Sequence, residues 1–190
     1  MIKAILDERA SLLFQARKGG IGAEIGVHEG GFSKRILQYA QPEKLYLIDP
    51  WQYQPDLEGS LYGGSGLNQE ILDARYAQVQ KRFAKQCTSG RVNLLRMDSL
   101  AALAHVEDNS LDFVYIDGDH RYPAVRADLN GWFNKVKPGG HIMVDDYRST
   151  GWWGTDVIRA CNEFLIERPV ELDTKIGSQI AFKKHNHTTP

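Results

Sequence analysis

Two acidic motifs each follow an apolar segment in this sequence. The segment LDFVYI runs into DGDH, and the segment IMV runs into DD. Carboxylates bind hard divalent cations such as Mg²⁺, and a histidine titrates close enough to neutrality to move a proton. If the two apolar segments are adjacent strands, their acids and one histidine converge on a single site. These residues are Asp117, Asp119, His120, Asp145 and Asp146.

The segment between the two motifs indicates how they come together. Apolar residues recur there at helical spacing, and Pro138-Gly139-Gly140 is expected to end the helix. The flanking segments, Leu111–Ile116 and Ile142–Val144, are apolar and β-branched, as buried strands are. A strand–helix–strand unit of this length implies two parallel strands joined by a right-handed crossover. Both strands then end at one edge of the sheet, where ligands of open α/β sheets bind.

Length and composition are those of an ordinary globular domain. The chain has 190 residues, of which 42% are hydrophobic and 25% charged, which fits one domain over residues 1–184 and a disordered tail at 185–190. The net charge of −1 gives no reason to expect binding to nucleic acid or to an anionic membrane. Two cysteines make no disulfide framework, and no apolar run indicates export or a membrane span. A cytoplasmic location is therefore expected.

The rest of the chain alternates strands and helices, which predicts an α/β fold. Further strands are expected at residues 21–26, 45–48 and 92–95, and helices at 2–18, from after Ser33 to about 39, and at 68–86, 100–104 and 155–167. A hairpin after the last helix, at 170–173 and 180–182, adds an antiparallel strand to the otherwise parallel sheet. Residues 52–67 are rich in Gln, Tyr, Pro, Gly and Ser, and this long loop at the ligand edge is interpreted as a lid.

A glycine-rich turn, EIGVHEGG, joins the first strand to the next helix. Glycines at Gly26 and Gly30 let the backbone approach a ligand and expose amide donors at the helix start. The G-x-G-x-x-G spacing of a dinucleotide site is absent. The carboxylate of Glu24 would repel a pyrophosphate, whereas a ligand with an ammonium group could use it. The alternative is a plain tight turn between strand and helix.

Two further strand ends carry candidate ligand-binding residues. Asp49 ends the second strand, about 20 residues beyond the glycines, where an acid commonly accepts hydrogen bonds from ribose hydroxyls. A helix cap or a surface acid is the alternative for Asp49. Trp51 could stack on a ligand ring or pack internally. Asp98 could accept from the exocyclic amine of adenine, although capping competes with that role, and Ser99 can cap the short helix that follows.

The ordered set of E-x-G-x-x-x-G, Asp49, Asp98 and Pro-Gly-Gly resembles the class I S-adenosylmethionine-dependent methyltransferases, from about Gly22 to Phe182. The resemblance implies a Rossmann-like, doubly wound α/β fold, with a seven-stranded, mostly parallel sheet, an antiparallel C-terminal strand and helices on both faces. It also implies S-adenosylmethionine as cofactor, with the methionine part at the glycine turn, the ribose at Asp49 and the adenine at Asp98. The candidate cofactor-binding residues are Glu24, Gly26, Gly30, Asp49, Trp51, Asp98, Ser99 and Asp117.

The motifs IDGDH and VDDY resemble the small-molecule O-methyltransferases of the macrocin and novobiocin type, and catechol O-methyltransferase. This resemblance implies that Asp117, Asp145 and Asp146 bind Mg²⁺ or another divalent cation. The catechol enzymes place a lysine base three residues after the first acid, and here His120 stands in that position. His120 and Asp117 are therefore the candidate catalytic residues. Asp119 could replace Asp117 as ligand, and the acids could also cap or bind water without metal.

We therefore expect methyl transfer to a hydroxyl group of a small-molecule acceptor. The adjacent Trp152 and Trp153 could line an aromatic or glycosidic acceptor pocket, or could bury against a partner subunit in a homo-oligomer. One alternative is an NAD- or nucleotide-sugar-dependent Rossmann enzyme, against which the missing glycine spacing speaks. Another is a protein that binds S-adenosylmethionine without catalysis.

Overall fold

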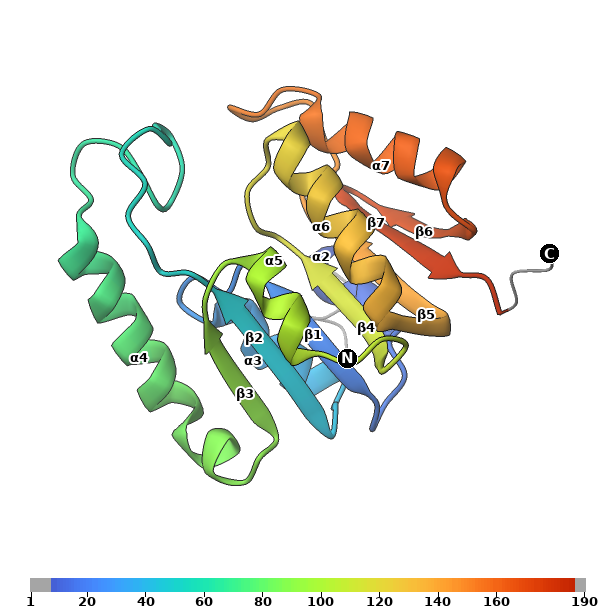
Figure 1. The fold of residues 1–190 in the computed structure, drawn as a ribbon, viewed down its shortest axis with the longest axis horizontal. Helices are drawn as coiled ribbons and strands as arrows, with labels where there is room; N and C mark the ends of the chain where they lie inside the picture. The colour runs from blue at the N-terminus through green and yellow to red at the C-terminus, as the bar shows by residue number, and fades with distance from the viewer. Residues whose placement is uncertain (1–7, 187–190) are drawn as a thin grey trace.

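The computed structural model describes residues 8–186 and has one seven-stranded sheet in the order β3-β2-β1-β4-β5-β7-β6 (Figure 1). Strand β7 pairs antiparallel with both β5 and β6, and the other pairs are parallel. This confirms the predicted mostly parallel sheet with an antiparallel C-terminal strand. The strands are β1 (Ile21–Ile25), β2 (Lys44–Asp49), β3 (Val92–Arg96), β4 (Leu111–Ile116), β5 (Val136–Val144), β6 (Val170–Ile176) and β7 (Gln179–Lys184).

Helices cover both faces of the sheet, as Figure 1 shows. Helices α5, α6 and α7 pack on one face, while α2, α3 and α4 contribute to the core on the other. No helix within residues 8–186 is both long enough and apolar enough to cross a bilayer. The helices are α2 (Glu8–Leu12), α3 (Gly31–Tyr39), α4 (Gln69–Thr88), α5 (Ser99–Ala102) with a 3₁₀ turn η1 (Leu103–His105), α6 (Tyr122–Lys135) and α7 (Asp156–Glu167).

The central strand β4 is apolar apart from Asp112, and both of its faces are buried. Successive side chains of a strand point to opposite faces of the sheet. Val114 and Ile116 therefore enter the core beneath α6 and α7, while Phe113 and Tyr115 enter the core beneath α3. Strands buried on two faces read as continuous apolar runs. The same crossover, β4-α6-β5, brings the carboxyl ends of β4 and β5 side by side.

Three local expectations differ from the structure. Helix α6 ends at Lys135, and the segment Pro138–Gly140 lies inside β5, where the register with β4 is irregular, instead of ending the helix. The cap of α5 is Asp98, whose carboxylate accepts a hydrogen bond from the backbone N–H of Leu100 (2.9 Å), so the expectation for Ser99 was wrong. The helix expected at residues 2–18 ends at Leu12, and its first part lies outside the described residues.

The predicted tail falls largely outside the described residues as well. His185 is described, and its backbone N–H donates a hydrogen bond to the carbonyl of Pro169 (3.0 Å). This bond extends the pairing at the end of β7 by one residue. Helix α3 begins at Gly31, three residues before its expected start, and the remaining helices lie within one or two residues of their expected positions.

We predict that Leu129→Ala lowers the free energy of unfolding by about 2–5 kcal/mol. The side chain of Leu129 is fully buried between α6 and the sheet, so its removal loses apolar contact and leaves a cavity. Ile166→Ala is the matched control, since Ile166 on α7 is 84% exposed and its truncation should cost less than about 0.5 kcal/mol. Urea unfolding of both variants measures the difference, and equal losses would contradict the prediction.

Candidate active site

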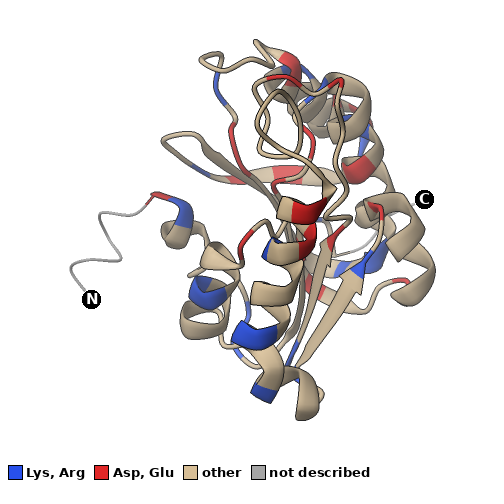
Figure 2. Cartoon of the chain, turned by 90° about the vertical axis from the view of Figure 1, so that its left-hand side faces the viewer, with Lys and Arg blue, Asp and Glu red and all other residues tan. Residues whose placement is uncertain are grey.

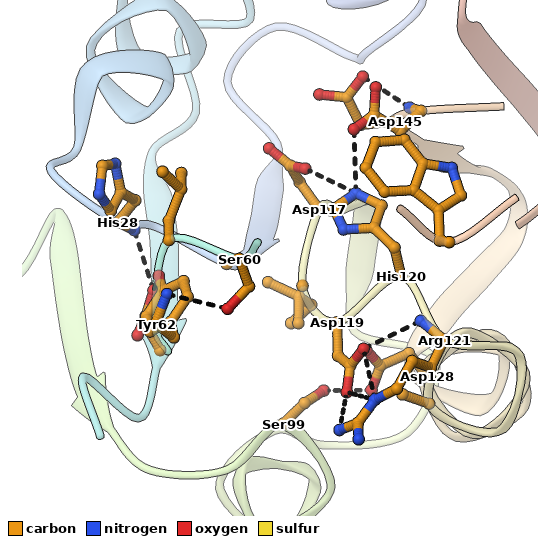
Figure 3. Close-up of a pocket in the computed structure, with 18 of the residues that line it drawn as sticks. His28, Ser60, Tyr62, Ser99, Asp117, Asp119, His120, Arg121, Asp128 and Asp145 are labelled. Atoms are coloured by element: carbon orange, nitrogen blue, oxygen red, sulfur yellow. Dashed lines mark hydrogen bonds and ion pairs between the residues drawn. The ribbon is translucent and has the colours of Figure 1, made fainter. Parts of the chain in front are cut away.

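A cavity of about 850 Å³ opens at the carboxyl ends of the parallel strands (Figure 3). Its volume lies in the range of small-molecule and cofactor sites. In Figure 3, His28 and Tyr62 lie on one side of the cavity, Asp117 and His120 lie on the other, and Ser99 lies below. Eight candidate residues from the sequence line this cavity. They are Gly26, Asp49, Asp98, Ser99, Asp117, His120, Asp145 and Asp146.

The cavity is strongly acidic. Seven aspartates and three arginines are among the described residues that line it. Figure 2 shows acidic residues on the loops and helix ends at this side of the sheet. Clefts lined mainly by one sign of charge concentrate ligands of the opposite sign. The cavity therefore suits a ligand that carries positive charge.

The glycine turn brings the ends of β1 and β4 close together. Gly26 has a positive φ of 85°, and a Cβ at this position would lie 2.0 Å from the carbonyl oxygen of Asp117. The N–H of Asp117 in turn donates to the carbonyl of Ile25 (2.8 Å). Only glycine fits both the conformation and the space. A glycine at position 26 therefore allows the backbone of Asp117 to lie directly against the end of β1.

Three candidate cofactor residues do not line the cavity. Glu24 is 1% exposed, and its carboxyl accepts a hydrogen bond from the hydroxyl of Ser33 beneath the turn. Burial raises the pKa of Glu24 to about 8, so this group is mostly protonated at neutral pH and is a poor partner for an ammonium group. A Cβ on Gly30 would lie 2.7 Å from the ring of Phe83, so this glycine is needed for packing.

Trp51 is the third of these residues, and its role is structural. The side chain is fully buried, its indole N–H donates to the carbonyl of His28 (2.8 Å), and its ring packs against Tyr76 at 4.9 Å between centroids. No face of the ring is open to a ligand. The expectation that Trp51 could stack on a cofactor is therefore not supported, and the packing alternative holds.

Asp49 organises the turn and contacts the loop at residues 52–67. One carboxylate oxygen accepts the backbone N–H groups of Val27 and His28, both at 2.9 Å, and also the hydroxyl of Tyr62. The other oxygen accepts the N–H of Trp51 (2.7 Å). Tyr62 belongs to the loop at residues 52–67, which contributes several residues to the cavity wall. The hydroxyl of Tyr62 thus contacts a carboxylate oxygen for which the sequence predicts a ribose hydroxyl as partner.

Asp117, His120 and Asp146 form a compact cluster on the other side of the cavity. Nε2 of His120 lies 3.5 Å from Oδ1 of Asp117 and 3.2 Å from Oδ2 of Asp146. This nitrogen is buried and makes no hydrogen bond of good geometry. Burial opposes protonation, but the two carboxylates outweigh it and raise the pKa of His120 to about 9. One ligand atom from each residue lies within 4.8 Å of the others, a spacing that can hold a metal ion.

Asp145 does not belong to this cluster, in contrast to the expected set of Asp117, Asp145 and Asp146. It is 5% exposed, and its Oδ2 lies 2.8 Å from Nε of Arg9. Its Oδ1 accepts hydrogen bonds from the side-chain amide of Gln179 and from the N–H of Asp146. Both aspartates follow the end of β5, and Asp146 has a positive φ of 57°. The chain turns between them, so the two side chains separate, and His120 takes the third place.

Asp119, the alternative ligand, also points elsewhere. Its carboxylate pairs with the guanidinium of Arg121, with Nε at 2.8 Å from Oδ2. Asp98 lines the cavity while it caps α5, so both roles considered for it are compatible. The hydroxyl of Ser99 donates to Asp128 (2.6 Å) and accepts the indole N–H of Trp132 (2.8 Å).

Sequence reasoning missed two residues of the cavity. Asp128 on α6 is 5% exposed, and burial raises its pKa to about 7. Its signal was present, because an acid three residues after Val125 lies on the apolar face of the helix. Arg9 on α2 reaches Asp117, with Nη2 at 2.5 Å from Oδ2. No motif in the sequence marks Arg9, since its partners are more than 100 positions away.

The two tryptophans form an aromatic wall beside the cluster. The ring of Trp153 stacks on His120, with centroids 4.5 Å apart and planes at 25°. Trp152 packs edge-on against Trp153 at 5.8 Å and is 42% exposed. A Cβ built on Gly59 would lie 3.8 Å from the Trp152 ring. The loop at residues 52–67 and the aromatic wall are therefore close neighbours.

Residues 23–147 match the model of a family described as a methyltransferase domain. An uncharacterised protein of Acanthamoeba polyphaga mimivirus is 26% identical over 144 residues, which cover 76% of this chain and 58% of that protein. The chain thus spans less than two thirds of this relative. The O-methyltransferase NovP has a TM-score of 0.64 at 19% identity, covering 94% of this chain and 80% of NovP. SMU.1697c from Streptococcus mutans, in complex with SAH, has a TM-score of 0.63 at 13% identity, covering 97% and 99%.

We predict that Glu24→Gln makes stability less dependent on pH. Burial raises the pKa of Glu24 to about 8 from its ordinary value of 4.5, so the folded state retains a proton that the unfolded state releases between these values. Stability from this group is complete below pH 4.5 and is lost as the pH rises through 8. Glutamine keeps the shape without the titration. Urea unfolding at pH 5, 7 and 9 measures the effect.

The exposed neighbour Glu29 provides the control. Glu29→Gln should leave the pH dependence of unfolding as it is in the wild type, because the Glu29 side chain is 54% exposed. An unchanged slope in Glu24→Gln would show that the buried carboxyl does not titrate in this window.

Proposed function

This chain belongs to the methyltransferase domain family, and we propose that it methylates a hydroxyl group of a small molecule with the aid of a divalent cation. Methyl transfer from S-adenosylmethionine follows from the family and the fold. The acceptor and the cation are supported by one observation above all. The cluster of Asp117, His120 and Asp146 lies beside an aromatic wall, in the same cavity as the residues assigned to the cofactor.

The described residues fit the cofactor. The glycine turn opens onto the cavity at Gly26, and Asp49 and Asp98 line it at the ends of β2 and β3. In our proposal Asp49 accepts ribose hydroxyls and Asp98 accepts the adenine amine. The Asp49 oxygen that Tyr62 contacts becomes free for ribose when the lid side chain moves. The acidic lining also suits the positive charge of a sulfonium donor.

The described residues also fit a divalent cation. A buried imidazole nitrogen without a good hydrogen bond faces two carboxylate oxygens, which is a donor set for a hard or borderline metal ion. Asp117, His120 and Asp146 would hold it. When bound, such a cation lowers the pKa of an acceptor hydroxyl and orients it. NovP, a structural neighbour, is an O-methyltransferase by its name, which supports oxygen as the accepting atom here.

The geometry favours a ligand role for His120 over the role of general base. A base needs an unprotonated nitrogen that the acceptor can reach. Nε2 is buried between the carboxylates of Asp117 and Asp146, away from direct contact with an acceptor. The stacked ring of Trp153 fixes the orientation of the imidazole. Trp152 and Trp153 are then placed to pack against an aromatic or glycosidic acceptor, and the lid is placed to exclude water.

One experiment distinguishes the proposed function from two other functions. The family match speaks against an NAD- or nucleotide-sugar-dependent enzyme. A protein that binds S-adenosylmethionine without catalysis would keep the same cavity. Titration calorimetry with S-adenosylhomocysteine and NAD, followed by methyl transfer to a panel of hydroxyl compounds with Mg²⁺ or with EDTA, separates these functions. We expect the protein to bind S-adenosylhomocysteine and not NAD, and we expect EDTA to abolish methyl transfer.

We predict that Asp146→Ala lowers cation-dependent turnover by about 10²-fold or more, because a misplaced acceptor loses its orientation. Affinity for S-adenosylhomocysteine should change by less than about twofold, since Asp146 lies across the cavity from the residues assigned to ribose and adenine. Calorimetry measures this affinity, and Mn²⁺ titration measures binding of the cation.

Asp119→Asn serves as the control, because Asp119 pairs with Arg121 outside the cluster. It should leave the cation affinity nearly unchanged. Loss of cofactor binding in Asp146→Ala to the same degree as turnover would show that the cluster supports the fold instead of the reaction.

A further inference from the structure

We propose that Arg9 binds the α-carboxylate of the methionine part of S-adenosylmethionine, while Asp117 receives its α-ammonium group. This inference rests on the proposed cofactor and adds a specificity residue to its site. Arg9 lines the cavity from helix α2, and its side chain is 36% exposed. It therefore presents a positive charge to a cavity whose charged lining side chains, among the described residues, are mostly acidic.

The guanidinium lies at the methionine end of the cavity. It sits 4.4 Å above the ring of Phe32, the second residue of α3, which begins where the glycine turn ends. It also lies beside Asp117, whose backbone contacts Gly26 of the same turn. The turn is where the methionine part of the cofactor is expected. Arg9 and the glycine turn thus converge on one end of the ligand.

The contacts of Arg9 leave capacity for a ligand. Nε lies 3.1 Å from the hydroxyl of Tyr115 and 2.8 Å from Oδ2 of Asp145, and Nη2 lies 2.5 Å from Oδ2 of Asp117. A guanidinium has five N–H donors in a planar fork, including two on Nη1. Such a fork binds carboxylates in a bidentate manner. The side chain is held in position by its acidic partners before a ligand arrives.

Arg9 and Asp117 together are complementary to an amino-acid zwitterion. The α-carbon of methionine carries one carboxylate and one ammonium group, and the protein places one guanidinium and one carboxylate in contact. Asp117 uses Oδ2 toward Arg9 and Oδ1 toward His120, so the two functions proposed for it involve different oxygens. Of the other acids near the turn, Glu24 is buried and bonded to Ser33, and Asp49 accepts the backbone N–H groups of Val27 and His28.

A purely structural role would explain the same contacts, since Arg9 also neutralises Asp117 and Asp145. The two roles predict different selectivity between ligands with and without the carboxylate. Decarboxylated S-adenosylmethionine keeps the sulfonium, the ammonium and the nucleoside, and lacks only the carboxylate. Titration calorimetry with both compounds therefore isolates the group that Arg9 is proposed to bind, without reference to turnover.

We expect the wild type to bind S-adenosylmethionine about 10- to 100-fold more tightly than the decarboxylated compound, as charge-assisted hydrogen bonds predict. Arg9→Met should lose this preference by weakening only the binding of S-adenosylmethionine. Arg9→Lys keeps the charge without the fork and should retain part of the preference. Arg17→Met is the control, because Arg17 is on the same segment, 76% exposed, and pairs with Asp112 instead (3.6 Å). It should behave as the wild type does.

Each outcome decides the inference. Equal loss of both compounds in Arg9→Met, with unchanged thermal unfolding, would assign Arg9 a structural role. Equal affinity of the wild type for both compounds would overturn the inference even if Arg9→Met fails to fold. Binding of neither compound by the wild type would overturn the proposed cofactor, and the inference with it.

Discussion

The ion pair between Asp117 and Arg9 joins the two halves of the site. Asp117 stands at the end of β4, where Gly26 allows its backbone to approach β1, and its carboxylate contacts Arg9 with one oxygen and His120 with the other. Arg9 also pairs with Asp145. Carboxylates crowded at one sheet edge repel one another unless a cation lies between them. The guanidinium supplies that cation, so the acids of β4 and β5 can share the edge.

Arg9 and His120 divide the acids at this sheet edge between them. Arg9 engages Asp145 and one oxygen of Asp117, while Asp146 and the other oxygen of Asp117 face His120. The raised pKa of His120 reflects the two carboxylates that face it, of which Asp146 also pairs with Arg148 (2.8 Å). A protonated imidazole and a divalent cation are alternative ways to balance their charge, which supports the cluster as a cation site.

Asp49 has the corresponding role at β2. Its carboxylate holds two backbone N–H groups of the glycine turn and one of Trp51, so the acid orders the loop that surrounds it. The remaining contact, from the hydroxyl of Tyr62, comes from the loop at residues 52–67. This loop therefore contacts the same group that is proposed to bind ribose.

The sequence alone determined the order of strands and helices, the antiparallel last strand and the edge at which the acids gather, because apolar periodicity and turn residues act locally and the crossover has one hand. Only the tertiary structure decided which side chains meet. It separated Asp145 from Asp146, buried Trp51, and brought Arg9 to acids more than 100 positions away. Side-chain direction depends on packing between distant segments, and a motif does not contain that information.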